Sequence, residues 1–146
     1  CYPSAVLGRG ATVITNRREI AADDFFVGMY TTALDEGEII TAIRFPIPKR
    51  AAYMKFKQPA SRFSLVGVFV AQFDAGVRVA VTGASSCVFR HAGLEAALSG
   101  SFTPQAAAAV AIDASDLNAD LHASAAYRAN LISVQTQRAV AKMTGA

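Results

Sequence analysis

The middle of the chain carries the alternation and the apolar runs that are typical of β-strands. Four such segments cover residues 38–48, 51–57, 64–73 and 77–86. The third, SLVGVFVAQF, leaves few polar positions, which predicts a central strand with both faces covered. Gly76 can adopt the positive φ of a tight hairpin loop between the last two segments. The pattern therefore predicts an antiparallel meander of these strands.

Shorter elements are expected before the meander. Val13 and Ile14 precede an Asn-Arg turn and residues 18–20 follow it, which indicates two short strands joined as a hairpin. Asp23 and Asp24 stand ahead of two phenylalanines, as acidic residues do in the first turn of a short helix.

After Cys87 alanine becomes frequent, and three helices are predicted. They cover residues 91–100, 103–112 and 124–143. Thr103 followed by Pro104 is a good pair for the start of a helix, and Ser124 can cap the last one. Strands first and helices second predict an α+β fold, in which a small antiparallel sheet of three to four strands packs on a three-helix bundle.

The last of these helices has an amphipathic pattern. Its apolar stripe recurs at spacings of three and four, through Tyr127, Leu131 and Val134 and then Thr136, Val140 and Met143. On the opposite side, Arg128, Gln135, Gln137 and Lys142 are expected to face water.

Composition limits the class of protein. The chain has 146 residues, of which 53% are hydrophobic and 17% charged, as expected for one globular domain. Its apolar runs are far shorter than the roughly 20 residues that cross a bilayer, so no transmembrane segment is expected. A net charge of +3 without dense basic runs argues against nucleic acid as a partner.

The two cysteines are too few for a disulfide framework, which favours a reducing cytoplasm. The first residues, Cys-Tyr-Pro, carry neither an initiating Met nor the features of a signal peptide. Either residues have been removed or the chain is a piece of a longer protein.

No catalytic constellation or metal site emerges from the residues themselves. His91 and His122 have no second ligand at a suitable spacing, so they are interpreted as surface or capping histidines. Cys87 is interpreted as a small buried thiol rather than a nucleophile. The glycines of LGRGATV do not complete a dinucleotide-binding loop.

Three separated blocks carry a resemblance to a known family. They are GATVITNRREIAADDFFVGMYTTALDEGEIITAIRFPIP, YMKFKQPASRFSLVGVFVA and LNADLHASAAYRANLISVQTQRAV. Together they resemble the C-terminal part of the FAD-binding medium subunit of molybdenum hydroxylases, of the aerobic carbon monoxide dehydrogenase and xanthine dehydrogenase type. The likeness runs from about Gly10 to Met143 and is nearest to the carbon monoxide dehydrogenase type.

The resemblance implies a division of the chain. Residues 1–20 correspond to the tail of the second FAD-binding subdomain, and residues 21–146 to the C-terminal domain of the family. In such complexes electrons pass from a molybdopterin-binding large subunit through an iron–sulfur small subunit to FAD. Because the family's glycine-rich FAD loops lie upstream of these residues, the fragment is expected to be inactive by itself and to bind FAD weakly or not at all.

The resemblance also implies site residues. Ile40 corresponds to an aliphatic residue against the flavin ring, Lys55 to a lysine near its pyrimidine edge, and Phe63 to a residue beside the ring. A cation near that edge favours the anionic reduced flavin. Lys57 competes with Lys55 for this role, since alternation places both on one strand face. Arg62 stands where the family often has Asp.

Other interpretations stay open. Cys1 also stands where the family often has Asp, and Lys55 and Phe63 are alternatively an exposed edge lysine and a core aromatic. A second hypothesis is a stand-alone binding or assembly module without redox activity. A third is a small-molecule-binding domain, which requires a cavity lined by Lys55 and Arg62. The substrate of the complex is not determined by these residues.

Overall fold

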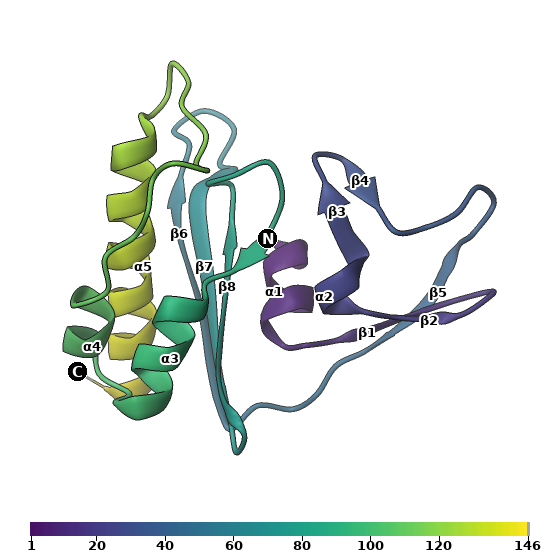
Figure 1. Cartoon of the computed structure of the whole chain (residues 1–146), viewed down its shortest axis with the longest axis horizontal. Helices are drawn as coiled ribbons and strands as arrows, with labels where there is room; N and C mark the ends of the chain where they lie inside the picture. Colours follow the sequence, from purple (N-terminus) through teal and green to yellow (C-terminus); the bar gives the residue numbers. More distant parts are fainter. Residues whose placement is uncertain (146) are drawn as a thin grey trace.

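A four-stranded antiparallel sheet forms the centre of the molecule (Figure 1). The computed structural model describes residues 1–145 of the chain. The strand order is β6-β7-β8-β9, with β6 (Arg50–Lys57), β7 (Ser64–Phe73), β8 (Gly76–Thr82) and β9 (Phe89–Arg90). Consecutive strands pair, so the predicted meander is confirmed for the segments that begin at β6.

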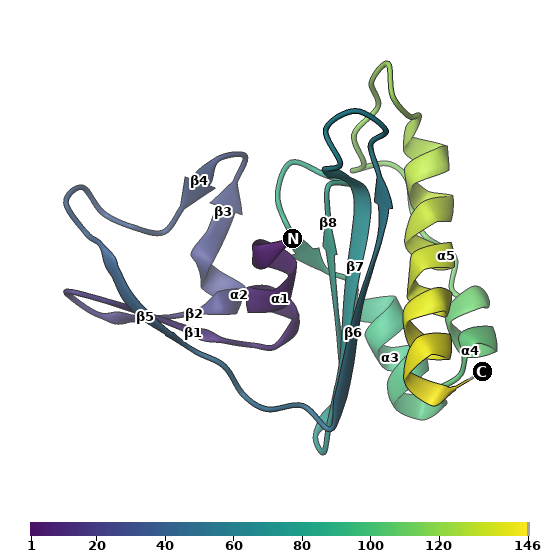
Figure 2. The same cartoon turned by 180° about the vertical axis from the view of Figure 1, so that it is seen from behind.

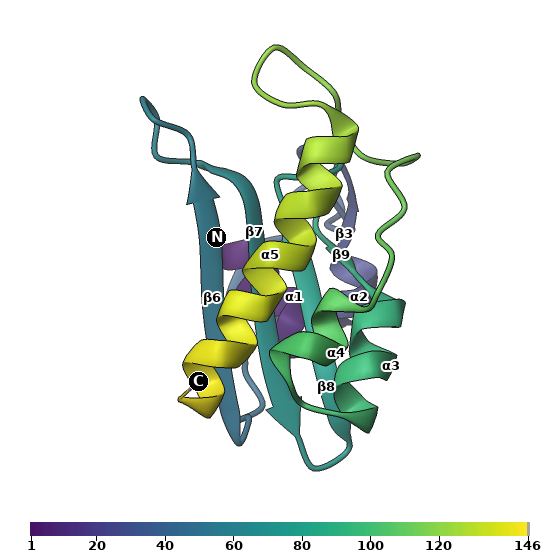
Figure 3. The ribbon, with the colours of Figure 1, turned by 90° about the vertical axis from the view of Figure 1, so that its left-hand side faces the viewer.

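Three helices cover one face of this sheet (Figure 3). They are α3 (Ala92–Gly100), α4 (Pro104–Ala108) and α5 (Ala125–Thr144). Side chains cap all three: the Nδ1 of His91, the hydroxyl of Thr103 and the hydroxyl of Ser124 each accept a hydrogen bond from a backbone N–H of the first turn. The predicted caps and the α+β fold, a small sheet on three helices, are therefore confirmed.

The strand β7 is the centre of the core. Val66, Val68 and Val70 have no exposed surface and face α5 and α3 with the buried leucines of those helices. The helix α1 (Tyr2–Gly8) lies on the opposite face. Gly8 permits its close approach because glycine has no Cβ, and a Cβ at this position would come within 2.6 Å of the Phe69 ring. Both faces of β7 are covered, as its apolar sequence predicted.

A smaller unit lies beyond α1 (Figures 1 and 2). It contains the sheet β2-β1-β5, the short helix α2 and the two-stranded hairpin β3-β4. The bounds are β1 (Thr12–Thr15), β2 (Glu19–Ala21), α2 (Ala22–Phe25), β3 (Phe26–Gly28), β4 (Thr31–Thr32) and β5 (Ile40–Arg44). The predicted hairpin of residues 13–20 and the helix after it are confirmed.

The segment of residues 38–48 was expected to open the meander, and this was wrong. Its strand β5 pairs with β1, where Ile43 lies opposite Val13. Pro46 and Pro48 follow β5 and have no N–H to donate to a ladder, so the chain leaves one sheet before entering the next. The fourth strand of the main sheet is β9 instead.

The boundary at residue 20 stays a prediction. Since β1 and β5 lie on either side of it, the smaller sheet draws its strands from both predicted parts of the chain.

Two residues of α5 were expected in water and are buried. Arg128 is 3% exposed and Gln135 is 1% exposed. The helix lies against β6 and β7 on one side and against α4 on another, which makes its buried stripe wider than a simple amphipathic pattern. Arg128 tolerates burial because carbonyl and carboxylate oxygens surround its guanidinium group.

Candidate functional site

A groove of about 690 Å³ opens between the β3-β4 hairpin and the adjacent ends of β7 and β8. We call it the hairpin groove. Its lining includes the aromatic side chains of Phe26, Tyr30 and Phe63, the first residue of β7, Ser64, and the loop residues Gly83 and Cys87. Among the described residues that line it there is no carboxylate, lysine, arginine or histidine. Such a lining suits a flat, mostly apolar ring.

Exposed aromatic side chains stand at the mouth of this groove. Phe63 is 77% exposed and the Tyr30 side chain is fully exposed. The interpretation of Phe63 as a core aromatic is therefore wrong. Leaving such rings in water forgoes the free energy of burying them, which is a recognised sign of a binding surface.

Backbone strain is found at the same place. Within residues 1–145, Tyr30 (φ 54°) and Arg62 (φ 63°) are the non-glycine residues with positive φ. One lies in the β3-β4 turn and the other directly precedes Phe63. A non-glycine residue in this region costs on the order of 1–3 kcal/mol, and such residues cluster at functional sites.

Lys55 forms a hydrogen bond to the turn that precedes Phe63. Its ammonium group donates to the carbonyl oxygen of Arg62 at 3.2 Å and lies 3.4 Å from the sulfur of Cys1, which lines the groove. The structure therefore brings Lys55, Arg62 and Phe63 together from the two ends of one hairpin.

Two of the predicted residues lie elsewhere. Ile40 is 44% exposed on β5, in the smaller sheet, and does not line the groove. Lys57 is exposed, and the register of β6 shifts between Phe56 and Lys57, which interrupts the alternation that placed it beside Lys55. Lys55 and Arg62 also lie outside the lining of the groove, so they do not form the cavity that the small-molecule hypothesis required.

The residue pattern missed a polar cluster beneath the groove. The hydroxyl groups of Tyr53 and Ser64 are 2.7 Å apart, and the Tyr53 hydroxyl donates to the sulfur of Cys1 at 3.3 Å. A Cβ on Gly67 would lie 2.4 Å from the Tyr53 hydroxyl oxygen, so this glycine makes room for the tyrosine. The sequence did contain one signal for this cluster: a glycine in the middle of an apolar strand often marks a site where another group approaches the backbone closely.

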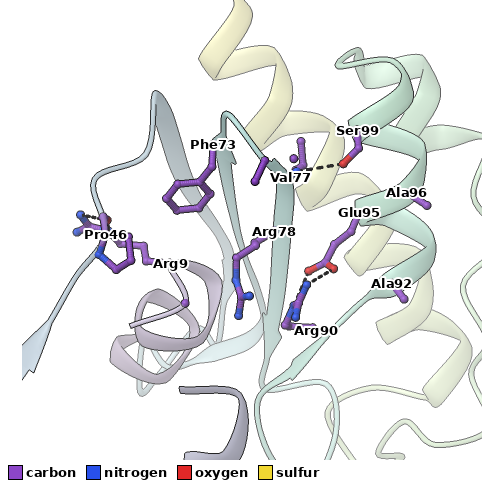
Figure 4. Close-up of a pocket in the computed structure, with 13 residues that line it drawn as sticks. Arg9, Pro46, Phe73, Val77, Arg78, Arg90, Ala92, Glu95, Ala96 and Ser99 are labelled. Carbon is purple, nitrogen blue, oxygen red and sulfur yellow. Dashed lines mark hydrogen bonds and ion pairs between the residues drawn. The ribbon is translucent and has the colours of Figure 1, made fainter. Parts of the chain in front are cut away.

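A second cavity, of about 590 Å³, lies where α1, β8 and α3 meet (Figure 4). Its arginines are engaged within the chain. Arg78 donates to the carbonyl oxygen of Leu7 and to Asp23, and Arg90 donates to Glu95 and Asp23. Partial burial opposes ionisation of Asp23, but the hydrogen bonds from Arg78 and Arg90 lower its pKa. These charges join the two units of the molecule, so the hairpin groove is the better candidate site.

No group of three or more His, Cys, Asp or Glu side chains within residues 1–145 is placed to hold a metal ion. Across the same residues, no helix combines the length and hydropathy needed to span a membrane.

Sequence relatives cover most of the chain. The nicotine 6-hydroxylase medium subunit of Paenarthrobacter nicotinovorans is 36% identical over 137 residues, which are 87% of this chain and 48% of that protein. The carbon monoxide dehydrogenase medium chain of Hydrogenophaga pseudoflava is 32% identical over 136 residues, 85% of this chain and 47% of that protein. The chain thus spans about half the length of the curated relatives it matches. No protein-family model matches it.

Solved structures share the fold. The crystal structure of quinoline 2-oxidoreductase from Pseudomonas putida 86 matches with a TM-score of 0.82 at 23% identity, over 98% of this chain and 55% of that chain. Cyanide-inactivated Cu,Mo-CO dehydrogenase matches with a TM-score of 0.82 at 23% identity, over 99% of this chain and 56% of that chain.

Fold and relatives together define the class, the medium subunits of molybdenum hydroxylases. The relatives include medium chains of carbon monoxide dehydrogenase as well as the medium subunit of nicotine 6-hydroxylase, in agreement with the resemblance that the sequence predicted.

Proposed function

We propose that this chain forms the part of an FAD-binding medium subunit that covers the isoalloxazine ring, and that the ring lies in the hairpin groove. The observation that carries the proposal is Phe63, an aromatic side chain held 77% exposed at the mouth of a groove lined without charged side chains. Stacking a flat ring on Phe63 removes apolar surface of both partners from water.

Lys55 has a defined part in this proposal. Its ammonium group is held by the carbonyl oxygen of Arg62, within one residue of Phe63. A cation at the edge of the groove favours the reduced flavin, which carries negative charge near N1 and C2=O. Lys55 therefore both fixes the turn and raises the tendency of a bound flavin to accept electrons. Ile40, Lys57 and Arg62 belong to the same proposal as flavin neighbours; like Lys55 they do not line the groove.

The partners belong to the same proposal. As part of a medium subunit, the chain docks against a molybdopterin-binding large subunit and an iron–sulfur small subunit in the cytoplasm, and its flavin receives their electrons. The division at residue 20 is also proposed, and limited proteolysis of the full-length subunit tests it: cleavage close to residue 20 supports the division. Cleavage confined to residues 45–49, between β5 and β6, overturns it.

Substitution of Phe63 tests the flavin proposal. In the full-length subunit, Phe63→Ala is expected to weaken FAD binding by about 2- to 10-fold, the value of one aromatic stacking contact. Flavin fluorescence during titration measures the affinity. Ile47→Ala, at a side chain that is 89% exposed and outside the groove lining, is the matched control and leaves the affinity unchanged. Equal affinities for the wild type and Phe63→Ala would overturn the proposal.

A stand-alone binding or assembly module is the alternative. The observation that favours it is the apolar surface of the smaller sheet, where Ile39 is 62% and Ile40 44% exposed, which suits a protein interface. The isolated chain distinguishes the two proposals. Under the flavin proposal, the isolated chain binds FAD weakly, and it is the full-length subunit that binds the partner subunits. Capture of partner subunits that is unaffected by removing FAD and by Phe63→Ala favours the assembly module.

A further inference from the structure

A buried arginine holds together the strand ends that frame the hairpin groove. Arg128 lies in the first turn of α5, and only 3% of its surface is exposed. Its Nη1 donates to the carbonyl oxygens of Leu65 and Gly83, both at 2.9 Å, and its Nη2 donates to a carboxylate oxygen of Asp120 at 2.8 Å. One guanidinium group therefore ties three segments that are far apart in the sequence.

Two of these segments belong to the groove. Leu65 directly follows Phe63 and Ser64, which line the groove, and Gly83 lines it as well. The β7-β8 pairing ends at Gly67 and Thr82. Beyond that point the two segments are not paired by backbone hydrogen bonds of the sheet. Instead, Nη1 of Arg128 donates hydrogen bonds to a carbonyl oxygen of each.

The strand ends are also as close as their backbones allow. Gly83 has a φ of +81°, and a Cβ there would lie 2.5 Å from the carbonyl oxygen of Ser64. Glycine permits the approach, and Arg128 supplies the attraction across it. Together they set the distance between Phe63 on one strand and the turn after β8 on the other.

Stability by itself does not explain this arrangement. The Nε of Arg128 is buried and has no hydrogen-bond partner among the described residues. A buried donor without an acceptor lowers stability, and an apolar side chain of similar size would avoid that cost. What an apolar side chain cannot do is fix two carbonyl groups at a defined separation.

We infer that Arg128 is a positioning residue for the flavin ring, acting through the backbone of Leu65 and Gly83 to hold Phe63 and the facing turn at the separation that the ring requires. This inference rests on the proposed function. Asp120 supports it by orienting the guanidinium group, and Asp120 is itself fixed by the backbone N–H groups of His122 and Ala123.

The test uses the full-length subunit with its FAD. Arg128→Met keeps an unbranched side chain in the core and removes all three hydrogen bonds, and we expect FAD affinity to fall by about tenfold, as when a residue supporting a direct ligand is lost. The visible absorption bands of the bound flavin are expected to shift, because the ring then sits in a changed environment. Arg138→Met, at an exposed arginine of the same helix, is the matched control and leaves both unchanged.

A second variant guards against loss of folding. Asp120→Asn keeps Arg128 in place and weakens its third anchor, so we expect a smaller decrease in FAD affinity with the same direction of spectral shift. If Arg128→Met and Asp120→Asn both leave the flavin spectrum and affinity unchanged, the inference is wrong. If Arg128→Met does not fold, an unchanged spectrum in Asp120→Asn is sufficient to overturn it.

The outcomes separate this inference from the proposed function. Where Phe63→Ala has no effect on FAD affinity, the flavin does not lie in the groove and the proposed function fails. Where Phe63→Ala weakens FAD binding while the Arg128 and Asp120 variants behave as wild type, the proposed function stands and the positioning role fails.

Discussion

The two sheets of the molecule are covered to very different degrees. In the main sheet, helices lie on both faces of β7, and Val66, Val68 and Val70 have no exposed surface. In the smaller sheet, every residue of β5 is exposed, from Ile40 to Arg44. The first sheet is stabilised by packing, whereas the second presents one of its edges and much of its apolar surface to solvent.

Polar contacts compensate in the smaller unit. The carboxylate of Glu38 is buried and accepts hydrogen bonds from Arg18, from the backbone N–H of Asp35 and from the hydroxyl of Thr15. These contacts lower the pKa of Glu38 to about 2. The comparison indicates that apolar substitutions weaken the main unit most, while acid acts on the smaller unit through Glu38.

The largest difference in unfolding free energy is expected when the same substitution, Ile→Ala, is made once in the main unit and once in the smaller unit. Ile132 of α5 has no exposed surface, and Ile132→Ala is expected to cost about 2–5 kcal/mol of unfolding free energy. Ile43 of β5 is 39% exposed, and Ile43→Ala is expected to cost less than about 1 kcal/mol. Denaturant unfolding measures both. Equal losses for the two variants contradict the comparison.

A matched pair of glycines comes next. Gly83 and Gly37 both have positive φ, so replacement by alanine costs about 1–2 kcal/mol in either case. Gly83→Ala also drives its Cβ to 2.5 Å from the backbone oxygen of Ser64, whereas the nearest atom to a Cβ on Gly37 is 3.4 Å away on the mobile end of Arg17. We expect Gly83→Ala to lower thermal stability more, by at least about 1 kcal/mol. Similar melting temperatures for the two variants count against the tight approach of β7 and β8.

Acid is expected to act through Glu38. Because its pKa is about 2 in the folded protein against an ordinary value of 4.5, its contribution to stability is complete above about pH 4.5 and is lost as the pH falls toward 2. Glu38→Gln is expected to melt at a lower temperature than the wild type at pH 7. The gap should narrow between pH 4.5 and 2. Thermal melts across this range measure it, and a gap that is independent of pH shows that the carboxylate charge does not contribute.

Exposed ion pairs are expected to matter least, and equally in both units. Glu19 pairs with Arg44 in the smaller unit and Asp74 pairs with Lys49 at the base of the main sheet, and all four side chains are more than half exposed. Glu19→Gln and Asp74→Asn are each expected to change the unfolding free energy by less than about 1 kcal/mol. Denaturant unfolding at low and high salt measures this. A larger, salt-insensitive loss at either position identifies a stronger local contact.

Local patterns predicted the elements well and their partners less well. The N-caps at Thr103 and Ser124 and the central strand β7 follow from neighbouring residues, because capping and alternation are short-range effects. The strand at residues 40–44 was expected, but its partner was not. Which strand it pairs with depends on β1, some 25 residues earlier, and periodicity carries no information on that choice.

The candidate site shows the same division. The resemblance pointed to Lys55, Arg62 and Phe63, and the structure places them together on one hairpin. Tyr30, Ser64 and Gly83 of the groove were not predicted, because they come from three separate segments that meet only in the folded chain.

The sequence by itself determined an α+β chain with a strand covered on both faces, three capped helices and a likeness to medium subunits of molybdenum hydroxylases. Tertiary structure decided the rest. The helical pattern predicted that Arg128 faces solvent. In the structure it is buried, and its guanidinium group donates to two carbonyl oxygens that are 63 and 45 residues away in the sequence, each at 2.9 Å. Burial of a charged side chain is decided by the oxygens that surround it, and the local sequence of a helix does not contain them.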